Sequence, residues 1–554
     1  MAITKSVGGF LNKKIIVEHL NSIVDNEITS WDQLPSYNEF LNMDKGIELF
    51  TKTVQNGNKI VFVHDSDVDG IGTYCVSYGV LSHLLLPNYE IKITDRSQGY
   101  GFQPLHLNGL KEGDLIITAD NGITSNIACR EARKIGVNVI VTDHHLVDKY
   151  EGLPDAIIID PHQKGCNFPY KHINGTMVYW YFMRAITDYY KTDINMIDYF
   201  LPELMLTTIS DVMPLTGINR FIVKTGLKYI KDTRNNGWTN KQWLNTFVQN
   251  CKSWDITSEA LAFGFIPALN AAARMAKAEY TAYYMIETDM VKSREWFDYL
   301  NAINNQRKQL QYDLKQYILD NYGSWMAQDF ILIPGANDNK LFSKGILGPT
   351  AGNLAEQFNK PTIVLKANNE GVYSGSGRSV GDVDMLGIIK ENPFTIQEKT
   401  GGHKAACGVA LESNNLNDFF LKLQEETKKV DRSLFKNNTH VLGKLELSEI
   451  NWDLYQSIRQ FEPFGQGFKR PQFLIKANVA SMTKTKDGKH MFLQLDDGLG
   501  STIKANWFNY NQEIKRGKQL TFCCTIQHDD FKEPNKQNLV LFIRSIGEFL
   551  DWDN

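Results

Sequence analysis

Residues 63–70 concentrate carboxylates that could bind metal ions. Asp65, Asp67 and Asp69 alternate along this stretch, directly behind the apolar run at residues 59–63. That run is short, rich in β-branched residues and followed by a helical pattern, which indicates a buried strand. Clustered carboxylates repel one another unless cations lie between them. Taken alone, the stretch is also compatible with a solvated acidic turn.

Three further apolar runs each stop at an acidic or imidazole side chain. Strands alternate with helical patterns here, which favours a parallel α/β sheet. Parallel strands place their carboxyl ends on one edge, so we expect these side chains to converge. One Asp after a strand is usually a helix cap, but a repeated ending of this kind argues for a site. The runs 114–119, 137–142 and 156–159 end at Asp120, at Asp143, His144 and His145, and at Asp160.

Together with Asp211, which follows a helical stretch, these side chains offer oxygen and imidazole ligands. Such a mixture suits Mn²⁺, with Mg²⁺ possible, and disfavours a metal that prefers thiolates. The carboxylates suffice for two ions that share a bridging Asp. Two ions would activate a water and clamp an attacked phosphate, so the chemistry is phosphoester hydrolysis without a covalent intermediate. Either His144 or His145 could bind the metal or contact the phosphate.

Composition sets wider bounds on the function. The chain has 554 residues, enough for three or four domains, and a net charge of −4, so it lacks a general basic signature for nucleic acid. None of the seven cysteines forms a C-x-x-C pair, so neither a zinc site nor a disulfide framework is expected. A reduced cytoplasmic compartment fits this pattern. Neither a membrane-spanning run nor a signal-peptide pattern is evident.

The remainder of the chain reads as several segments. Residues 1–58 are predicted to be a helical lead-in, and helices dominate residues 177–323, ending in a long polar helix that bridges two domains. A second α/β unit begins near residue 329. Its Gly-Ser-Gly-Arg stretch at residues 375–378 could bind an anion through backbone N–H groups and Arg378, although an ordinary hairpin turn is equally compatible.

From about residue 440 the pattern is all-β and typical of a small five-stranded barrel. Basic and aromatic side chains are interleaved in it, which suits single-stranded nucleic acid. Most of the aromatic side chains could equally fill the barrel core. The basic set includes Lys469, Arg470, Lys476, Lys484 and Lys489, and the aromatic set is Phe464, Phe468, Phe473, Phe492, Trp507 and Phe508.

Four motifs together resemble the DHH phosphoesterase superfamily: Asp-Ser-Asp-Val-Asp-Gly at 65–70, Asp-Asn-Gly at 120–122, Asp-His-His at 143–145 and Ser-Asp-Val-Met-Pro-Leu at 210–215. The chain is most similar to the RecJ branch, single-strand-specific 5′→3′ DNA exonucleases. This closer resemblance covers roughly residues 59–550 and rests on the further stretches 96–101, 270–275, 375–379, 401–403 and 462–465.

The resemblance implies an α/β fold. Two α/β domains, a DHH domain and a DHH-associated domain, would be joined by a long helix around a cleft and followed by a C-terminal OB-fold barrel. The implied division is 1–58 lead-in, 59–290 DHH domain with the two-metal site, 291–325 connecting helix, 326–435 DHH-associated substrate-binding domain and 436–554 OB-fold domain.

The resemblance also assigns roles to residues. The metal ligands would be Asp67, Asp69, Asp120, His144 and Asp211. Asp120 would also count as catalytic, with Asp65 as an accessory acid and His145 as a phosphate contact. Arg96, Arg274, Ser376 and Arg378 would receive the 5′ end and its phosphate, and His403 would lie in a glycine motif that closes the site. Ala268, Ala273, Ser343 and Lys344 depart from the family pattern.

The function implied is a metal-dependent 5′→3′ exonuclease that hydrolyses single-stranded DNA to mononucleotides with two divalent cations, Mn²⁺ preferred or Mg²⁺. It would act in DNA recombination, repair or replication. The alternatives are a phosphodiesterase for short oligonucleotides or cyclic dinucleotides, and a non-catalytic single-strand-binding replication factor. Expected partners are single-stranded DNA and a single-strand-binding protein or helicase, with no membrane. A monomer is expected, in the cytoplasm of a bacterial cell or of a host if the chain is phage-encoded.

Overall fold

The computed structural model forms two compact units. The larger unit comprises residues 5–270, 278–298 and 440–554, and the smaller unit residues 1–4, 271–277 and 299–439. The described residues are 3–5, 9–24, 28–95, 99–147, 152–236, 239–251, 256–435, 439–486, 488–510, 512–529 and 536–547.

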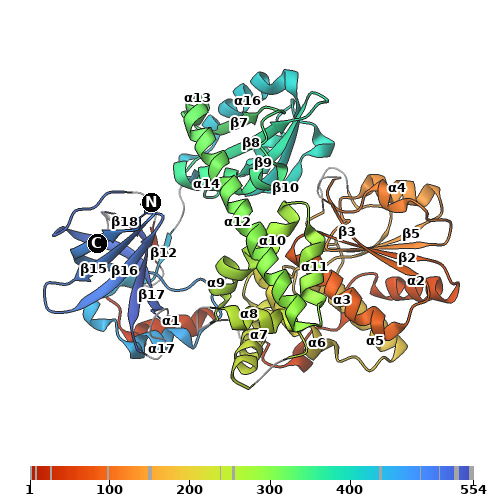
Figure 1. Ribbon diagram of the computed structural model, residues 1–554, viewed down its shortest axis with the longest axis horizontal. Helices are drawn as coiled ribbons and strands as arrows, with labels where there is room; N and C mark the ends of the chain where they lie inside the picture. Colours follow the sequence, from red (N-terminus) through yellow and green to blue (C-terminus); the bar gives the residue numbers. More distant parts are fainter. Residues whose placement is uncertain are drawn as a thin grey trace. The chain divides into compact units, whose positions relative to one another are not determined.

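A five-stranded parallel sheet is the core of the first part of the larger unit (Figure 1). Its strands are short, and β2, β4 and β5 are almost wholly buried, as the apolar runs predicted. In the order β3-β2-β4-β5-β6, the first strand of the sheet, β2, has β3 on one side and β4 on the other. The chain therefore adds strands on opposite sides of β2, which makes β2 a switch point. Ligands bind at such a switch point in open α/β sheets. The strands are β2 (Ile60–His64), β3 (Tyr89–Ile93), β4 (Leu115–Ala119), β5 (Asn138–Thr142) and β6 (Ile157–Ile159).

Helices cover both faces of this sheet (Figure 1). On one face, α4 (Asn126–Lys134) buries Ala128, Cys129 and Ala132 against strand residues such as Val61 and Ile116. On the other, α3 (Val68–Leu84) packs on β2 and on α5 (Gly175–Tyr190). The helical pattern that follows the first apolar run forms α3, which begins at Val68 because Asp67 caps it.

The N-terminal 58 residues are not one lead-in segment. Ile16 and Leu20 of α1 (Lys13–Ile23) are buried in the core of the C-terminal barrel. Phe50 of α2 (Met43–Gln55) packs edge-on against Phe182 of α5. The sequence predicted helical structure here, but an amphipathic helix does not specify which of two cores it covers.

A helical region follows the parallel sheet. It includes a five-residue π-helical turn, Leu261–Phe265, directly before α10. The last helix, α12, has 32 residues and begins in the larger unit and ends in the smaller one, as the long polar pattern predicted. The helices are α6 (Met196–Ser210), α7 (Gly217–Asn236), α8 (Gln242–Asn250), α9 (Ser258–Ala260), α10 (Ile266–Arg274), α11 (Ala278–Ile286) and α12 (Met290–Asn321).

The smaller unit contains a mixed five-stranded sheet, ordered β10-β11-β9-β8-β7. The Gly-Ser-Gly-Arg stretch lies in its central strand β9, so a hairpin turn at these residues was wrong. The elements are β7 (Ile331–Gly335), β8 (Thr362–Ala367), β9 (Val372–Arg378), β10 (Gly401–His403), β11 (Ala406–Glu412), α13 (Gly323–Met326), α14 (Lys344–Phe358), α15 (Met385–Lys390) and α16 (Leu416–Lys429). A short two-stranded sheet pairs β1 (Ile3–Lys5) with β12 (Thr439–Val441).

The C-terminal part of the larger unit closes into a barrel. Strand β14 pairs with both β15 and β17, and β16 and β18 complete a ring of five strands. This confirms the predicted five-stranded barrel, with helix α17 (Trp452–Arg459) as an addition. The strands are β13 (Gly443–Lys444), β14 (Phe473–Lys484), β15 (His490–Asp496), β16 (Thr502–Phe508), β17 (Gln519–His528) and β18 (Leu539–Ile546).

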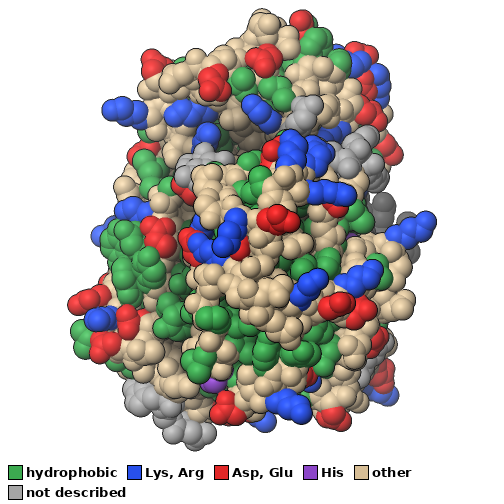
Figure 2. Space-filling view, turned by 90° about the vertical axis from the view of Figure 1, so that its right-hand side faces the viewer, with side chains coloured by type: hydrophobic (Ala, Val, Ile, Leu, Met, Phe, Trp, Pro, Cys, Tyr) green, Lys and Arg blue, Asp and Glu red, His purple; other side chains and the backbone are tan. Residues whose placement is uncertain are grey.

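Surface character agrees with the small net charge. On the face shown in Figure 2, Lys and Arg side chains are interspersed with Asp and Glu. Within the described residues, no helix combines the length and the apolar character that crossing a membrane requires.

Candidate metal centre

The strand ends of the parallel sheet are in register. His64 of β2 lies opposite Ala119 of β4, and Ala119 lies opposite Thr142 of β5. The residues that come next, Asp65, Asp120 and Asp143, therefore leave the sheet at the same level. This alignment brings the acids of three distant segments to the switch point of the sheet.

Asp67 has two roles in the structure. Its Oδ1 accepts hydrogen bonds from the N–H groups of Asp69 (3.1 Å) and Gly70 (3.3 Å), so it caps α3. It also joins Asp65 and Asp120 in a group whose ligand atoms all lie within 4.8 Å of one another. Asp65 is held there by the hydroxyl of Thr94, which donates to its Oδ1 at 3.0 Å. The solvated-turn alternative is wrong, because Asp65 and Asp69 are each only 2% exposed.

The start of α5 fixes Asp69. Its Oδ2 accepts from the N–H of Gly175 at 2.7 Å, and its Oδ1 accepts from the N–H (2.9 Å) and hydroxyl (2.6 Å) of Thr176. Burial is the main reason that the pKa of Asp69 rises to about 7, and the nearby charge of Asp67 adds to it. Each hydrogen bond orients the carboxylate without neutralising it, as expected of an anchored ligand.

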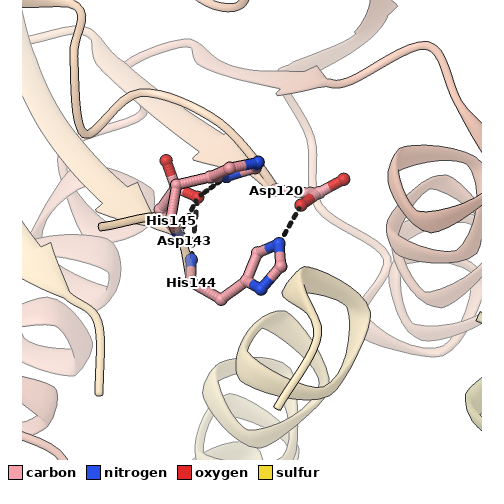
Figure 3. A group of neighbouring side chains, drawn as sticks. All are labelled: Asp120, Asp143, His144 and His145. Atoms are coloured by element: carbon pink, nitrogen blue, oxygen red, sulfur yellow. Dashed lines mark hydrogen bonds and ion pairs between the residues drawn. The ribbon is translucent and has the colours of Figure 1, made fainter. Parts of the chain in front are cut away.

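The ring of His144 lies among three carboxylates. Its Nε2 is 3.2 Å from Oδ1 of Asp120, 3.6 Å from Oδ2 of Asp211 and 3.8 Å from Oδ2 of Asp69 (Figure 3 shows the contact with Asp120). Burial, and then the charge of His145, lower the pKa of His144 to about 3. The ring is therefore neutral at physiological pH, which is the state that binds a metal.

Asp120 belongs to both groups of acids. It adopts a left-handed backbone with φ of 62°, and its Oδ1 lies so close to α5 that a Cβ on Gly175 would stand 2.2 Å away. Burial, followed by the charges of the surrounding aspartates, raises the pKa of Asp120 and of Asp211 well above the usual range. Asp120 Oδ1 and Asp211 Oδ2 are buried and accept no hydrogen bond from any described residue. Oxygen atoms in this condition fit a bound cation.

The pKa of the neighbouring His145 is shifted in the opposite direction, upward. Its Nδ1 donates to Oδ1 of Asp143 at 2.7 Å, and the same oxygen accepts from the N–H groups of His144 and His145 (Figure 3). Burial opposes the change, but the charge of Asp143 and this hydrogen bond raise the pKa of His145 to about 10. In turn, although burial opposes it, the His145 cation lowers the pKa of Asp143. His145 is therefore an imidazolium beside a neutral His144.

One of the predicted positions, Asp160, does not join this centre. Asp160 is buried at the end of β6, but among the described residues it belongs to none of the acid groups and instead accepts from the N–H of His162. Arg96 lies outside the described residues.

Sequence reasoning missed the residues that hold the ligands in place. Thr94, Gly175 and Thr176 are examples, and Asn270 is another. Asn270 accepts from the N–H of Val68 (3.1 Å) and donates to the hydroxyl of Ser210 (3.2 Å), so it connects the two acidic segments. Thr176 stands at the start of a helix, where hydroxyl side chains are common, and Asn270 was noted only as part of the stretch 270–275, without a role.

The predicted substrate residues lie in the smaller unit. Ser376 and Arg378 share one face of β9 and pack on the first turns of α14, where a Cβ on Gly348 would be 2.9 Å from Nη2 of Arg378. Arg274 ends α10, and its carbonyl lies against Gly345. His403 is exposed on β10, opposite Ala406, which is itself opposite Arg378.

The basic and aromatic set of the barrel divides into core and surface. Phe464, Phe468, Phe473 and Trp507 are buried, whereas Phe492 is 42% and Phe508 46% exposed. Arg470 is not a surface cation, because it is 6% exposed and pairs with Glu259 and Glu462.

Comparisons with known proteins agree with this organisation. Residues 59–209 match the DHH family, N-terminal domain; residues 333–429 match the DHHA1 domain; and residues 443–544 match the RecJ OB domain. The single-stranded-DNA-specific exonuclease RecJ of Salmonella typhimurium is 28% identical over 462 residues, 80% of this chain and 78% of the relative. The protein of the same description from Haemophilus influenzae is 27% identical over 538 residues and 92% of each chain.

The fold is shared with a solved structure. The crystal structure of RecJ in complex with Mn²⁺ from Thermus thermophilus covers 98% of this chain and 76% of its own, with a TM-score of 0.75 and 19% identity. The chain therefore combines a DHH domain, a DHHA1 domain and a RecJ OB domain, and it is similar to RecJ exonucleases over most of its length.

Proposed function

We propose that the protein is a metal-dependent 5′→3′ exonuclease that hydrolyses single-stranded DNA to mononucleotides and acts in DNA recombination, repair or replication. The observation that carries the proposal is the position of His144, a neutral imidazole with its Nε2 within 3.8 Å of three carboxylates, of which Asp69 and Asp120 are buried. The described relatives are single-stranded-DNA-specific exonucleases, which supports the same substrate class.

Two divalent cations, Mn²⁺ or Mg²⁺, would bind in this cluster. Asp67 and Asp120 would hold one, with Asp65 beside them, and Asp69, His144 and Asp211 would hold the other with Asp120 as the shared ligand. Bound there, divalent cations supply an activated water and neutralise charge on the attacked phosphate. The protein's own contribution is to collect the carboxylates and to keep the imidazole unprotonated.

Charged groups outside the ligand set would bind the substrate phosphates. His145, held as an imidazolium by Asp143, would contact the scissile phosphate. In the smaller unit, Arg378 and Ser376 face the start of the 15-residue helix α14, and helix N-termini favour anions. We assign the 5′ phosphate to this place, with Arg274, Arg96 and His403 as further contacts.

The outer face of the barrel would bind bases of the strand. Phe492 and Phe508 project from adjacent strands, and Phe508 makes an edge contact with Phe542 of β18 at 5.2 Å between ring centroids. Exposed aromatic rings on such strands stack bases regardless of sequence. A single-strand-binding protein or helicase as partner, a monomeric state, a cytoplasmic location and the domain limits given above belong to the same proposal.

Digestion of end-labelled DNA tests the proposal. Single strands labelled at either end, and the matching duplex, are incubated with Mn²⁺, Mg²⁺ or EDTA. We expect 5′-labelled single strands to release labelled mononucleotides first, only with a divalent cation, and duplex to resist. Hydrolysis confined to dinucleotides would favour the small-substrate phosphodiesterase, and binding without hydrolysis would favour the replication factor.

A further inference from the structure

A segment of the barrel domain, residues 461–470, packs on the turn that carries Asp211. We propose that this segment, called the clamp segment below, is a positioning element that holds Asp211 in the metal centre. The inference rests on the proposed function, in which Asp211 binds a cation. It assigns the Glu-Pro-Phe-Gly stretch at residues 462–465 a role in the metal centre, in addition to any role of the barrel in binding DNA.

The Asp211 turn is intrinsically weak. Asp211 ends α6, and the next residue, Val212, adopts a left-handed backbone with φ of 54° and is 64% exposed. A β-branched residue is strained in this conformation, so surrounding contacts must maintain it. The charges of Asp69 and Asp67 also repel the Asp211 carboxylate. Without support, the turn would relax away from the other ligands.

The clamp segment supplies that support through its backbone. The carbonyl of Gln466 accepts a hydrogen bond from the N–H of Leu215 at 2.7 Å. A Cβ on Gly465 would stand 2.7 Å from Cδ1 of Leu215, and one on Gly467 would stand 3.1 Å from Cβ of Pro214. Both glycines therefore permit a close approach at which a side chain would displace Leu215 or Pro214, and Leu215 is 3% exposed.

Two buried arginines fix the clamp segment itself. Arg220 of α7 donates from Nη1 to the carbonyl of Pro463 (2.9 Å) and from Nη2 to that of Phe461 (2.7 Å). Its guanidinium also lies over the ring of Phe468, 4.5 Å from the centroid. Arg470 pairs with Glu259 and Glu462, each at 2.8 Å. Paired and hydrogen-bonded guanidinium groups hold a fixed geometry, so the segment is a rigid support.

The connection to Asp211 is short. Helix α7 begins at Gly217, directly after the turn, and Asn219 of this helix donates to the carbonyl of Pro214 at 3.0 Å. The clamp segment thus contacts the turn directly at Leu215 and indirectly through α7. A displacement of Leu215 or of the start of α7 would therefore also shift Asp211, which is only four to six residues away in the chain. Groups that orient metal ligands typically contribute about 10- to 100-fold to metal affinity.

Gly465→Ala tests the proposal, with Gly264→Ala as the matched control. A Cβ on Gly264 meets nothing within 4 Å, so the same methyl group is added without a clash. The metal-free proteins are titrated with Mn²⁺ by calorimetry, melted in EDTA, and assayed on a 5′-phosphorylated single strand. We expect Gly465→Ala to bind Mn²⁺ about tenfold more weakly and to lose about tenfold in kcat, with KM near the wild-type value. Gly264→Ala should match wild type.

A compensating variant separates positioning from a general loss of stability. Leu215→Val shortens the side chain that the new methyl group meets, so the double variant Gly465→Ala/Leu215→Val should recover much of the Mn²⁺ affinity. If Gly465→Ala melts far below wild type, Arg220→Lys provides the same comparison, because a lysine keeps the charge but lacks the planar fork that donates to both carbonyls and stacks on Phe468.

Two outcomes would overturn the positioning role while wild type still binds Mn²⁺ and digests DNA. One is an unchanged Mn²⁺ affinity and kcat in Gly465→Ala. The other is a rise in KM alone, which would show that the segment serves strand binding. A wild-type protein that binds no Mn²⁺ would instead refute the proposed function, and the positioning role with it.

Discussion

Neutralising Asp120 should make the metal-free protein more stable while abolishing its chemistry. Asp120 is 2% exposed, and its ligand atom lies within 4.8 Å of those of Asp65 and Asp67. Two ionised carboxylates at that separation repel by about 3.5 kcal/mol at an effective dielectric constant of about 20. Asp120→Asn keeps the shape of the side chain and removes the charge.

The native protein limits this repulsion by protonation, so the gain is smaller than the full Coulomb energy. Keeping a carboxyl protonated above its unfolded-state pKa lowers the free energy of unfolding. The loss is about 1.4 kcal/mol for each pH unit between the unfolded-state pKa and the pH of the measurement, up to the folded-state pKa. We expect Asp120→Asn to gain about 1–3 kcal/mol at pH 8 in EDTA, which corresponds to a rise in Tm of roughly 1–4 °C for a unit of about 400 residues. The gain should shrink toward pH 5.

The sign of this pH dependence follows from linkage. The folded-state pKa of Asp120 is raised above its unfolded value, so the wild-type protein binds more protons when folded. The stability contributed by this group is therefore greatest at low pH and is lost as the pH rises toward the folded-state pKa. Asp120→Asn cannot titrate at this position and should show a flatter curve. Asp69, with a pKa of about 7, contributes a fall of the same sign in both proteins.

Asp114→Asn is the matched control at the opposite end of β4. Asp114 is also 2% exposed, but its oxygens accept from the N–H groups of Lys59 (2.9 Å) and Lys111 (3.0 Å). The amide of an Asn has one acceptor oxygen and cannot accept both hydrogen bonds. Asp114→Asn should therefore lower the free energy of unfolding by about 1–2 kcal/mol, and Tm with it. It should leave the stabilisation by Mn²⁺ intact, because Asp114 lies at the opposite end of β4 from the candidate metal ligands.

Thermal melts in EDTA and in Mn²⁺ provide the assay. Saturation at about 100 times Kd should stabilise wild type and Asp114→Asn by about 2.7 kcal/mol, and Asp120→Asn by much less. Digestion of single-stranded DNA should be lost in Asp120→Asn alone. The reasoning is refuted if Asp120→Asn melts below wild type in EDTA, or if it keeps both the Mn²⁺ shift and turnover.

Three further predictions concern neighbouring features. Gly175→Ala places a Cβ 2.2 Å from Oδ1 of Asp120, so Mn²⁺ affinity measured by calorimetry should fall at least tenfold; unchanged affinity would contradict the packing. Arg378→Lys should raise KM about tenfold for 5′-phosphorylated strands but little for 5′-hydroxyl strands, because a lysine cannot bind bidentately; equal effects on both would refute the assignment. Phe508→Ala and Phe492→Ala should each weaken binding of a long single strand by about 1–3 kcal/mol in a filter or anisotropy assay, with kcat on a short strand unchanged; a loss of kcat would place these rings elsewhere.

The parallel sheet and its ligand edge could be predicted from the sequence because both depend on local patterns. Short apolar runs that each stop at an Asp or His specify strands, and the parallel arrangement aligns their ends. Asp160 shows the limit of this argument. It obeys the same pattern at the end of β6, yet it lies at the far edge of the sheet from β2, and the pattern contains no information on lateral distance.

Other features depended on contacts between distant segments. The glycines of β9 were compatible with a turn because glycine favours turns, but in the structure Gly375 and Gly377 provide room for Val364 and Met385. Arg470 belongs to a basic run in the sequence, but Glu259, some two hundred residues earlier, converts it into a buried ion pair. The order of acids and glycines along a chain does not reveal such partners.

The two adjacent histidines show what the fold adds to a motif. By residue type they are equivalent, and only the family resemblance assigned the metal to His144 and the phosphate to His145. Asp143 distinguishes them, because its Oδ1 accepts from Nδ1 of His145 and holds that ring as a cation, while His144 turns its Nε2 toward Asp120. The His145 cation also lowers the pKa of His144. One buried carboxylate therefore produces both a positive group for a phosphate and a neutral nitrogen for a metal, and this requires the two histidines to be adjacent.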